Sequence, residues 1–212
     1  MQLKESKGEY NEMTNKDFYT AIKTRRSIHS LKKESPISDD RIQEIVEYAV
    51  KYAPTAFNSQ STRAVVLFGE QHDKLWDITT ETLRRIVPED SFSSTEEKMS
   101  SFKGAYGTVL FFSDESVIRS LQEQFSLYAD NFPVWGEHAT GILQYIVWTS
   151  FAVEGLGASL QHYNPLIDEA VRKEWGIPEE WKLTGQMPFG VPAEPAGEKE
   201  FAPISDRVKV FK

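Results

Sequence analysis

The segment 137–153 is apolar on nearly every side when it is wound as a helix. Its apolar side chains do not keep to one stripe and comprise Ile142, Leu143, Tyr145, Ile146, Val147, Trp148, Phe151 and Ala152. A helix that is hydrophobic all round is stable in water only when other elements cover its sides. The sequence therefore predicts a central helix buried within an assembly, with the rest of the chain packed around it.

The remaining elements follow from the spacing of apolar residues. Two β-branched and aromatic runs, 64–68 and 108–112, are typical of buried strands, and further strands are predicted over 158–162 and 182–191. Helices with a period near 3.6 residues are predicted over 14–23, 38–53, 75–86, 117–128 and 168–175. Thr14 with Asp17 resembles a capping box, and Ser38 can cap the second helix, which Pro54 ends. We expect the polar segment 88–101 to be a surface excursion or a short helix.

The order of these elements indicates the fold class. Helices and strands alternate without the regular βαβ rhythm of a dinucleotide-binding fold, so we expect an α+β fold. A chain of 212 residues is long enough for one domain, here 13–212, and the polar residues 1–12 are expected to be a flexible N-terminal extension.

Composition excludes several classes of function. The net charge of −8 argues against a nucleic-acid partner, which would need a basic face. The chain has no cysteine, which excludes disulfides, thiolate nucleophiles and cysteine-ligated metals. It also has no secretory signal and no run of about 18 apolar residues, so we expect no membrane partner and a cytoplasmic location.

Residues 24–31, TRRSIHSL, place basic and hydroxyl side chains directly after the first helix. Arg25 and Arg26 suit a solvated helix end, because cations near a helix C-terminus interact favourably with its dipole. Ser27, His29 and Ser30 add further donors, and a guanidinium beside hydroxyls also suits the bidentate bonds that bind a phosphate monoester. The pattern leaves both interpretations open.

The stretch 54–61, PTAFNSQS, has the composition of an ordinary loop that ends a helix. Thr55, Asn58, Ser59 and Gln60 nevertheless present the donors and acceptors needed to bind the edge of a polar heterocycle.

The spacing of histidines and glycines argues against a metal site and against two kinds of nucleotide-binding loop. The histidines at 29, 72, 138 and 162 form no HxxxH pair, so no metal site is predicted, and neither a complete GxGxxG nor a phosphate-binding GxxxxGK[ST] loop occurs.

The chain resembles the FMN-dependent nitroreductase family in the order of three features: R-R-S (25–27), P-T-A-F-N-S-Q (54–60) and the hydrophobic strand that follows. Further matching stretches are FKGAYGTVLFF (102–112), ADNFPVWGEHATGILQ (129–144), GLGASLQHYNPLID (155–168) and GQMPFGVPAEPAGEKEF (185–201). The resemblance extends over 14–211. It is strongest to the small branch that includes the copper-induced nitroreductase of lactic-acid bacteria and the fungal fatty-acid-repression proteins.

The resemblance implies the nitroreductase fold, in which helices surround a central mixed sheet, and an intertwined homodimer with FMN in grooves at the subunit interface. It also implies which residues hold the phosphate and ribityl groups: Arg25, Arg26 and Ser27, with His29 nearby, and with Arg207 and Lys209 completing the clamp. By themselves, Arg207 and Lys209 equally suit a frayed charged tail.

The same resemblance implies which residues contact the flavin ring. It implies that Pro54, Thr55, Phe57 and Asn58 line the isoalloxazine and reach the flavin of the partner subunit, with Gln60 supporting their loop. The residues whose main chain is expected to face flavin N5 are Gln161, His162 and Tyr163, where the chain departs from the Pro-x-Glu-Gly pattern of other family members. Lys103, or second Lys98, is the candidate cation for N1 and O2 of the ring, and each also suits a plain surface lysine.

The implied substrate region carries an aromatic stripe of Phe125, Tyr128, Phe132 and Trp135, followed by His138. These aromatic residues equally suit core packing. In the family this region reaches over the flavin of the partner subunit, where the rings can stack on a flat acceptor.

The implied activity is a ping-pong, two-electron transfer from NADH or NADPH through FMN to a nitroaromatic or quinone-like acceptor. No catalytic side chain is expected, because flavin N5 carries the hydride. Two alternatives stay open. One is a specialised flavin reaction such as reductive dehalogenation, and the other is a non-catalytic, FMN-binding protein of a stress or lipid response.

Overall fold

The apolar run 108–112 forms the middle of β3 (Gly107–Asp114), a strand whose residues are all buried. The computed structural model describes residues 17–212. Val109 and Phe111 pack into one core and Leu110 and Phe112 into another, because successive side chains of a strand point to opposite faces. The prediction of a buried strand is confirmed, and it is buried on both faces.

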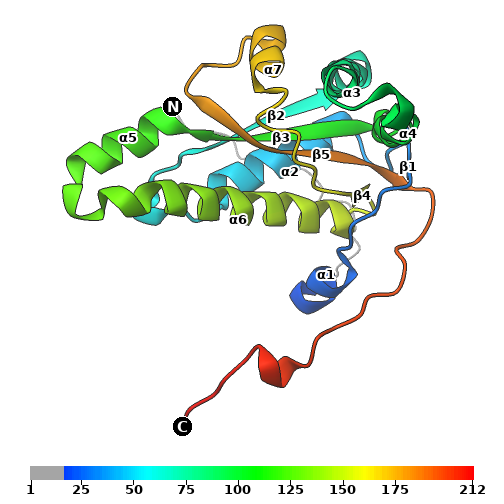
Figure 1. The fold of residues 1–212 in the computed structure, drawn as a ribbon. Coiled ribbons are helices and arrows are strands. Elements are labelled where there is room, and N and C mark those ends of the chain that lie inside the picture. Colours follow the sequence, from blue (N-terminus) through cyan, green and yellow to red (C-terminus); the bar gives the residue numbers. More distant parts are fainter. Residues whose placement is uncertain (1–16) are drawn as a thin grey trace, which may run out of the picture.

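The strands form one sheet in the order β1-β5-β3-β2, with β4 also paired to β5 (Figure 1). Their bounds are β1 (Leu31–Lys32), β2 (Thr62–Phe68), β4 (Gly157–Ala158) and β5 (Trp181–Pro192). Every ladder is antiparallel, and the register places Leu110 between Val65 of β2 and Gln186 of β5. The described strands thus form an antiparallel sheet rather than the expected mixed one, and the parallel pairing between Ser27 and Ala158 is an isolated bridge outside the strands.

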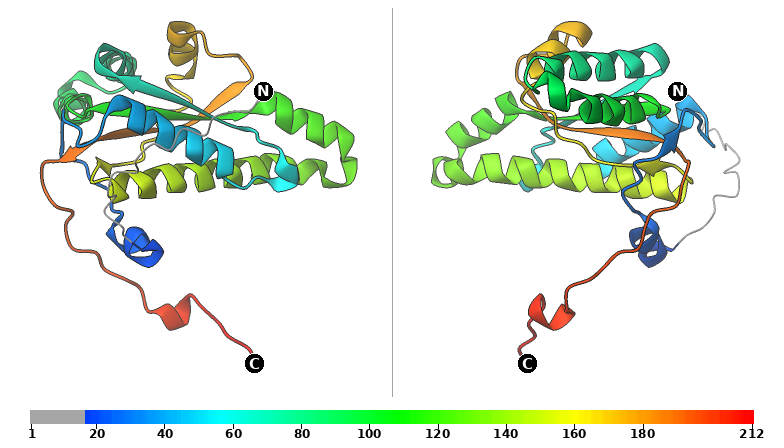
Figure 2. Two further views of the ribbon diagram at one scale, coloured as in Figure 1. Left: turned by 180° about the vertical axis from the view of Figure 1, so that it is seen from behind. Right: turned by 45° about the vertical axis from the view of Figure 1, so that its right-hand side comes forward.

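Helices cover both faces of the sheet, as the views in Figures 1 and 2 show. One layer holds α2 (Asp39–Tyr52) and α6 (Phe132–Val153), and the other holds α3 (Gly69–Arg84), α4 (Phe92–Lys103) and α7 (Asp168–Trp175). The remaining helical elements are α1 (Phe18–Thr24), η1 (Ala56–Asn58), η2 (Glu89–Ser91), α5 (Glu115–Gln124), η3 (Ser126–Asn131) and η4 (Ile204–Asp206). The α+β class expected from the order of elements is confirmed.

Helix α6 is the predicted central helix, and it begins earlier than expected, with Pro133 in its first turn. Leu143, Val147 and Phe151 recur every four residues and are completely buried against the sheet. On the other side Ile142 and Tyr145 remain 38% and 39% exposed. A single chain therefore covers only one side of this apolar helix. No helix within residues 17–212 is long and apolar enough to cross a bilayer.

Several predicted boundaries are corrected. Helix α1 is capped by Asp17, whose carboxylate accepts from the N–H of Tyr19 and of Thr20, whereas Thr14 and the predicted extension 1–12 lie outside the described residues. The helix predicted over 117–128 ends at Gln124 and continues as the 3-10 turns of η3.

Two further segments are now defined. The polar stretch 88–101, expected to be a surface excursion or a short helix, contains the helix α4, which buries Phe92, Met99 and Phe102. The strand predicted over 158–162 has only two paired residues, followed by a bridge between Gln161 and Gln186. Pro188 faces the gap and has no N–H to donate, so the ladder is interrupted there.

Candidate functional site

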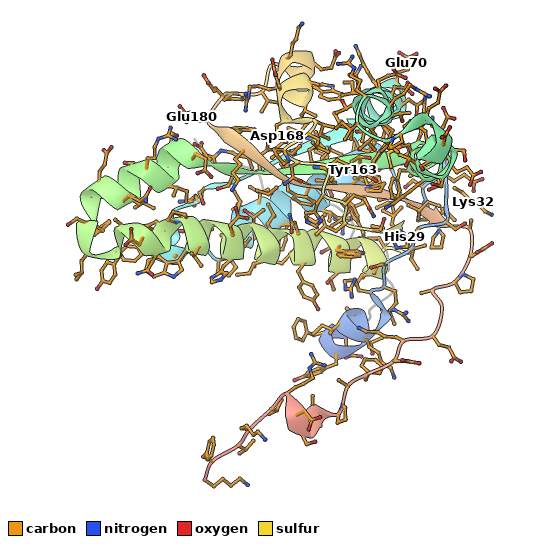
Figure 3. The ribbon with its side chains drawn as sticks, viewed as in Figure 1. His29, Lys32, Glu70, Tyr163, Asp168 and Glu180 are labelled. Atoms are coloured by element: carbon orange, nitrogen blue, oxygen red, sulfur yellow. The ribbon has the colours of Figure 1, made fainter. Side chains whose placement is uncertain are left out.

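The arginine pair lies where the first helix meets the sheet. Arg25 is the C-cap of α1, and its N–H donates to the carbonyl of Ala21. Directly after the pair, the N–H of Ile28 donates to the carbonyl of Ala158 at 2.9 Å. His29 lies beside the C-terminal end of α6 in Figure 3. The segment is therefore fixed to the sheet edge by its backbone, while Ser27 and His29 are exposed.

The two arginine side chains have different surroundings. The guanidinium of Arg26 donates to the carbonyl of Gly197 at 2.8 Å, which ties it to the C-terminal segment. The guanidinium of Arg25 lies over the ring of Trp148, with its central carbon 4.4 Å from the ring centroid. Among the described residues Arg25 has no side-chain hydrogen-bond partner. It is thus the arginine of the pair that is available to an anion.

The loop that contains η1 has an unusual backbone. Phe57, Asn58 and Gln60 have φ angles of 56°, 50° and 51°, in the left-handed region that residues other than glycine rarely adopt. Such conformations cost on the order of 1–3 kcal/mol each and persist only where the surrounding structure imposes them. Here Thr55 does so, because its carbonyl accepts from the N–H of Asn58 at 3.0 Å and its hydroxyl from that of Gln60 at 3.0 Å.

Arg63 joins this loop to the sheet. Its guanidinium donates to the carbonyl of Gln60 at 2.6 Å and to the carboxylate of Asp114 at 2.8 Å. Asp114 is the buried last residue of β3 and also caps α5. The strained loop is therefore held from both ends, which is the arrangement expected of a binding loop rather than of a loose connection.

Phe57 projects into a group of rings that we call the aromatic cluster. Its centroid lies 4.9 Å from that of Phe125 and 5.9 Å from that of Trp135, to which it is nearly parallel at 19°. The cluster consists of Phe57, Phe125, Tyr128, Phe132 and Trp135. It joins the predicted flavin-lining loop to the predicted substrate stripe.

The members of the aromatic cluster are not equally buried. Phe132 is 1% exposed and serves packing, whereas Phe57 is 50% exposed and Tyr128 is also open to solvent. A hollow of about 380 Å³ adjoins Phe57. Its other lining residues are Asn58, Ser59, Ser116, Val117, Ser120 and Leu121. Within the cluster, Phe132 thus packs in the core, whereas Phe57 and Tyr128 present their rings to solvent.

The predicted N5 contacts are distinguished by their hydrogen bonds. The N–H of Gln161 donates to the carbonyl of Gln186 at 2.7 Å, and the N–H of Tyr163 to the same residue's side-chain oxygen at 2.7 Å. The Tyr163 ring packs instead against α3 and α4, on the opposite face of the sheet from α6 (Figure 3). Within the described part of the chain, only His162 of these three keeps an unpaired main-chain N–H.

Several other predicted residues are not brought to the aromatic cluster. Lys103, at the end of α4, pairs with Asp77 of α3 at 2.6 Å, in the helical layer on the far side of the sheet from α6. Lys98 of the same helix lies over the ring of Phe102. Arg207 and Lys209 are exposed in the C-terminal tail (residues 193–212). Pro54 and His138 are exposed, Pro54 beside η1 and His138 on α6.

The carbonyl of Lys103 takes part in a buried network. It accepts from His72 Nε2 at 3.1 Å, and since a carbonyl can only accept, His72 Nδ1 must accept from the hydroxyl of Thr108 at 2.9 Å. That hydroxyl oxygen accepts in turn from the indole N–H of Trp76 at 3.1 Å. Burial lowers the pKa of His72 from 6.5 to about 4. The imidazole is therefore neutral at pH 7.

This network predicts a loss of stability in acid. The pKa of His72 is lower in the folded state than in the unfolded state, so its stabilising contribution is complete above pH 6.5 and declines toward pH 4. When the pH is lowered from 7 to 5, protonation of His72 in the unfolded state should reduce the free energy of unfolding by about 2 kcal/mol. Urea titrations at the two pH values measure it. The His72→Gln variant should lose this part of the pH dependence, and an identical pH dependence in the variant would contradict the assignment.

Comparison with known proteins gives the family. A model described as the nitroreductase family matches residues 22–191. The chain belongs to the nitroreductase family. Family membership confirms the fold class and the resemblance found in the sequence, and it supports a flavin-dependent oxidoreductase.

This nitroreductase-family chain is similar to two yeast proteins. It is 38% identical over 196 residues to HBN1 of Saccharomyces cerevisiae, and the alignment covers 92% of this chain and 96% of HBN1. It is 36% identical over 197 residues to the nitroreductase FRM2 of the same yeast, with coverages of 92% and 97%.

A bacterial structure is also similar. The nitroreductase CinD from Lactococcus lactis, solved in complex with 4-nitrophenol, is 49% identical and superposes with a TM-score of 0.83 over 92% of this chain and 100% of CinD. CinD has also been solved with chloramphenicol and with nicotinic acid, at TM-scores of 0.84 and 0.81. Together with the yeast relatives, these matches confirm the branch that the sequence indicated.

Sequence reasoning missed three parts of the candidate site. They are Trp148 beneath Arg25, Arg63 behind the strained loop, and the α5 residues that line the hollow beside Phe57. In the sequence, Trp148 is one more apolar residue of the run 137–153. Arg63 is the second residue of β2, and its role is visible only in its contacts with Gln60 and Asp114.

Proposed function

We propose that this chain is an FMN-dependent NAD(P)H oxidoreductase that reduces nitroaromatic or quinone-like acceptors by two-electron transfer. The observation that carries the proposal is the Arg25 guanidinium, which is fixed on the face of Trp148, has no hydrogen-bond partner among residues 17–212 and is followed by the exposed hydroxyl of Ser27. A dianionic phosphate requires such a set of donors.

The residues of the site fit FMN in their chemistry. Arg25 and Ser27 would hold the phosphate, with His29 beside them. Thr55, Phe57 and Asn58 lie at the opposite end of α6 from Arg25 and would line the ring system of the flavin bound by the partner subunit, because their loop offers polar groups and a half-exposed aromatic side chain together. The main-chain N–H of His162 is the donor we assign to the N5 region. We propose no lysine for N1 and O2, because Lys103 is already paired with Asp77.

When bound, FMN supplies the redox chemistry, accepting a hydride from the reduced nicotinamide and passing two electrons to the acceptor. The protein contributes binding, orientation and a surface on which flat molecules can stack. Phe57, Tyr128 and Trp135 provide that surface, and Phe132 packs beneath it. No side chain needs to act as an acid or base, since water can supply protons.

The relatives support the choice of substrates. The match with CinD covers the full length of CinD. CinD has been solved with 4-nitrophenol, a nitroaromatic, and with nicotinic acid, which shares the pyridine ring of nicotinamide. Alternate binding of a donor and an acceptor on one surface is the arrangement that ping-pong kinetics requires. We propose the same alternation here.

We also propose that the chain acts as an intertwined homodimer in the cytoplasm. Large apolar side chains are exposed on α1, on the outer side of α6 and along the tail, all on the α6 side of the sheet in Figures 1 and 2. They are Phe18, Tyr19, Val134, Ile142, Tyr145, Phe201, Ile204, Val208, Val210 and Phe211. A second copy of the chain would cover them, and its tail would bring Arg207 and Lys209 to a shared phosphate site.

One spectroscopic experiment tests the function. Purified protein, reconstituted with FMN if necessary, should show flavin absorbance, lose its colour when NADH or NADPH is added without oxygen, and regain it when 4-nitroquinoline N-oxide or a quinone follows. Protein that takes up no flavin would reject the proposal. Yellow protein that neither cofactor bleaches would instead favour a non-catalytic, FMN-binding role.

A further inference from the structure

Trp148 of α6 contacts the residue on which the proposed phosphate site depends. The guanidinium carbon of Arg25 lies 4.4 Å from the centroid of the Trp148 ring, within the range of a cation–π interaction. Trp148 belongs to the apolar run of α6 and is half-buried.

The orientation of the indole is fixed by one carbonyl. The indole N–H of Trp148 donates to the carbonyl of Ala158 at 3.1 Å, and the N–H of Ile28 donates to the same oxygen at 2.9 Å. Ala158 thereby fixes both the ring plane and the chain just beyond Arg25. The packing is close here, because a Cβ on Gly157 would lie 3.0 Å from the side chain of Ile28.

An arginine stacked on an aromatic ring keeps an uncompensated charge and free N–H donors, whereas an ion-paired arginine does not. Arg41 pairs with Glu154 at 2.7 Å and Arg63 with Asp114 at 2.8 Å, so a carboxylate already compensates each of those charges. An aromatic face orients a guanidinium without neutralising it and leaves the N–H groups at its edge free to donate. The Arg25–Trp148 pair has this second arrangement.

We propose that Trp148 is a positioning residue that holds Arg25 in the orientation that binds the phosphate of FMN. This inference rests on the proposed function and extends it to a residue that does not itself contact the flavin phosphate. It implies that Trp148 distinguishes FMN from riboflavin, which has the same ring system and no phosphate.

The test compares the affinities of FMN and riboflavin, measured by quenching of flavin fluorescence on flavin-depleted protein. In Trp148→Leu we expect FMN binding to weaken about fivefold, as the loss of one cation–π contact implies, with riboflavin binding unchanged. Trp148→Phe keeps an aromatic face but loses the bond to Ala158 that fixes its plane, so it should recover part of the FMN affinity. Adding Trp148→Leu to Arg25→Ala should cause no further loss, because the two residues act through one contact.

The outcomes separate this inference from the proposed function. Wild-type protein that binds neither flavin overturns both. Wild-type preference for FMN that survives in Trp148→Leu overturns only the role of Trp148. Equal losses of FMN and riboflavin, in the leucine and the phenylalanine variants alike, would also overturn it, because they would mean that Trp148 only supports the fold.

Discussion

Replacement of Arg25 by alanine is expected to weaken FMN binding by about 10- to 100-fold, which corresponds to a lost charged hydrogen bond of about 1.5–3 kcal/mol. The physical reason is that Arg25 is the guanidinium of the arginine pair that stays free of protein acceptors in the described residues, whereas Arg26 is engaged by Gly197. Flavin fluorescence titrations measure the change, and riboflavin affinity should stay nearly constant.

The matched control is Lys23→Ala. Lys23 is an exposed cation in the last turn of the same helix, so its removal changes the net charge equally without touching the proposed clamp. FMN affinity should change little in this variant. If Arg25→Ala binds FMN as tightly as the wild type, or if Lys23→Ala loses as much, the assignment of the phosphate site is wrong.

Removal of residues 201–212 is expected to convert the proposed dimer to a monomer and to abolish tight FMN binding. This part of the tail carries Phe201, Val210 and Phe211, and Phe211 is 92% exposed. Burial of each such side chain against a second copy would contribute about 1.5–3 kcal/mol. The truncation leaves the bond between Arg26 and Gly197 in place, so the fold of the remaining chain should be retained. Sedimentation equilibrium measures the association state.

A double variant separates the apolar and the basic parts of the tail. Arg207→Ala with Lys209→Ala keeps every apolar side chain and should remain dimeric while binding FMN more weakly, because only the phosphate contacts are lost. A truncated chain that stays dimeric with full FMN affinity would refute both roles of the tail.

Patterns within short stretches predicted much of this fold. The continuous apolar run 108–112 predicted a buried strand, and Ser38 and Pro54 predicted the limits of α2. The all-apolar character of 137–153 predicted a central helix. These features are visible in a sequence because caps, proline effects and side-chain periodicity act over a few residues.

The candidate site was only partly predictable. The donors of Arg25 to His29 and the loop at 54–60 stand out by composition, but the left-handed backbone of Phe57 does not, because it is imposed by bonds to Thr55 and by Arg63. Lys103 was the expected flavin cation by its place in the chain. Its pairing with Asp77 depends on how α3 and α4 pack, which no local pattern specifies.

By itself, the sequence determined the periodicities, the capped helix ends, the α+β order and the family resemblance, all of which depend on neighbouring residues or on their order. The tertiary structure alone decided which residues meet: Trp148 beneath Arg25, and Phe57 against Phe125 and Trp135. These contacts join residues far apart in the chain, and their geometry is set by the packing of whole helices on the sheet, which short-range propensities do not encode.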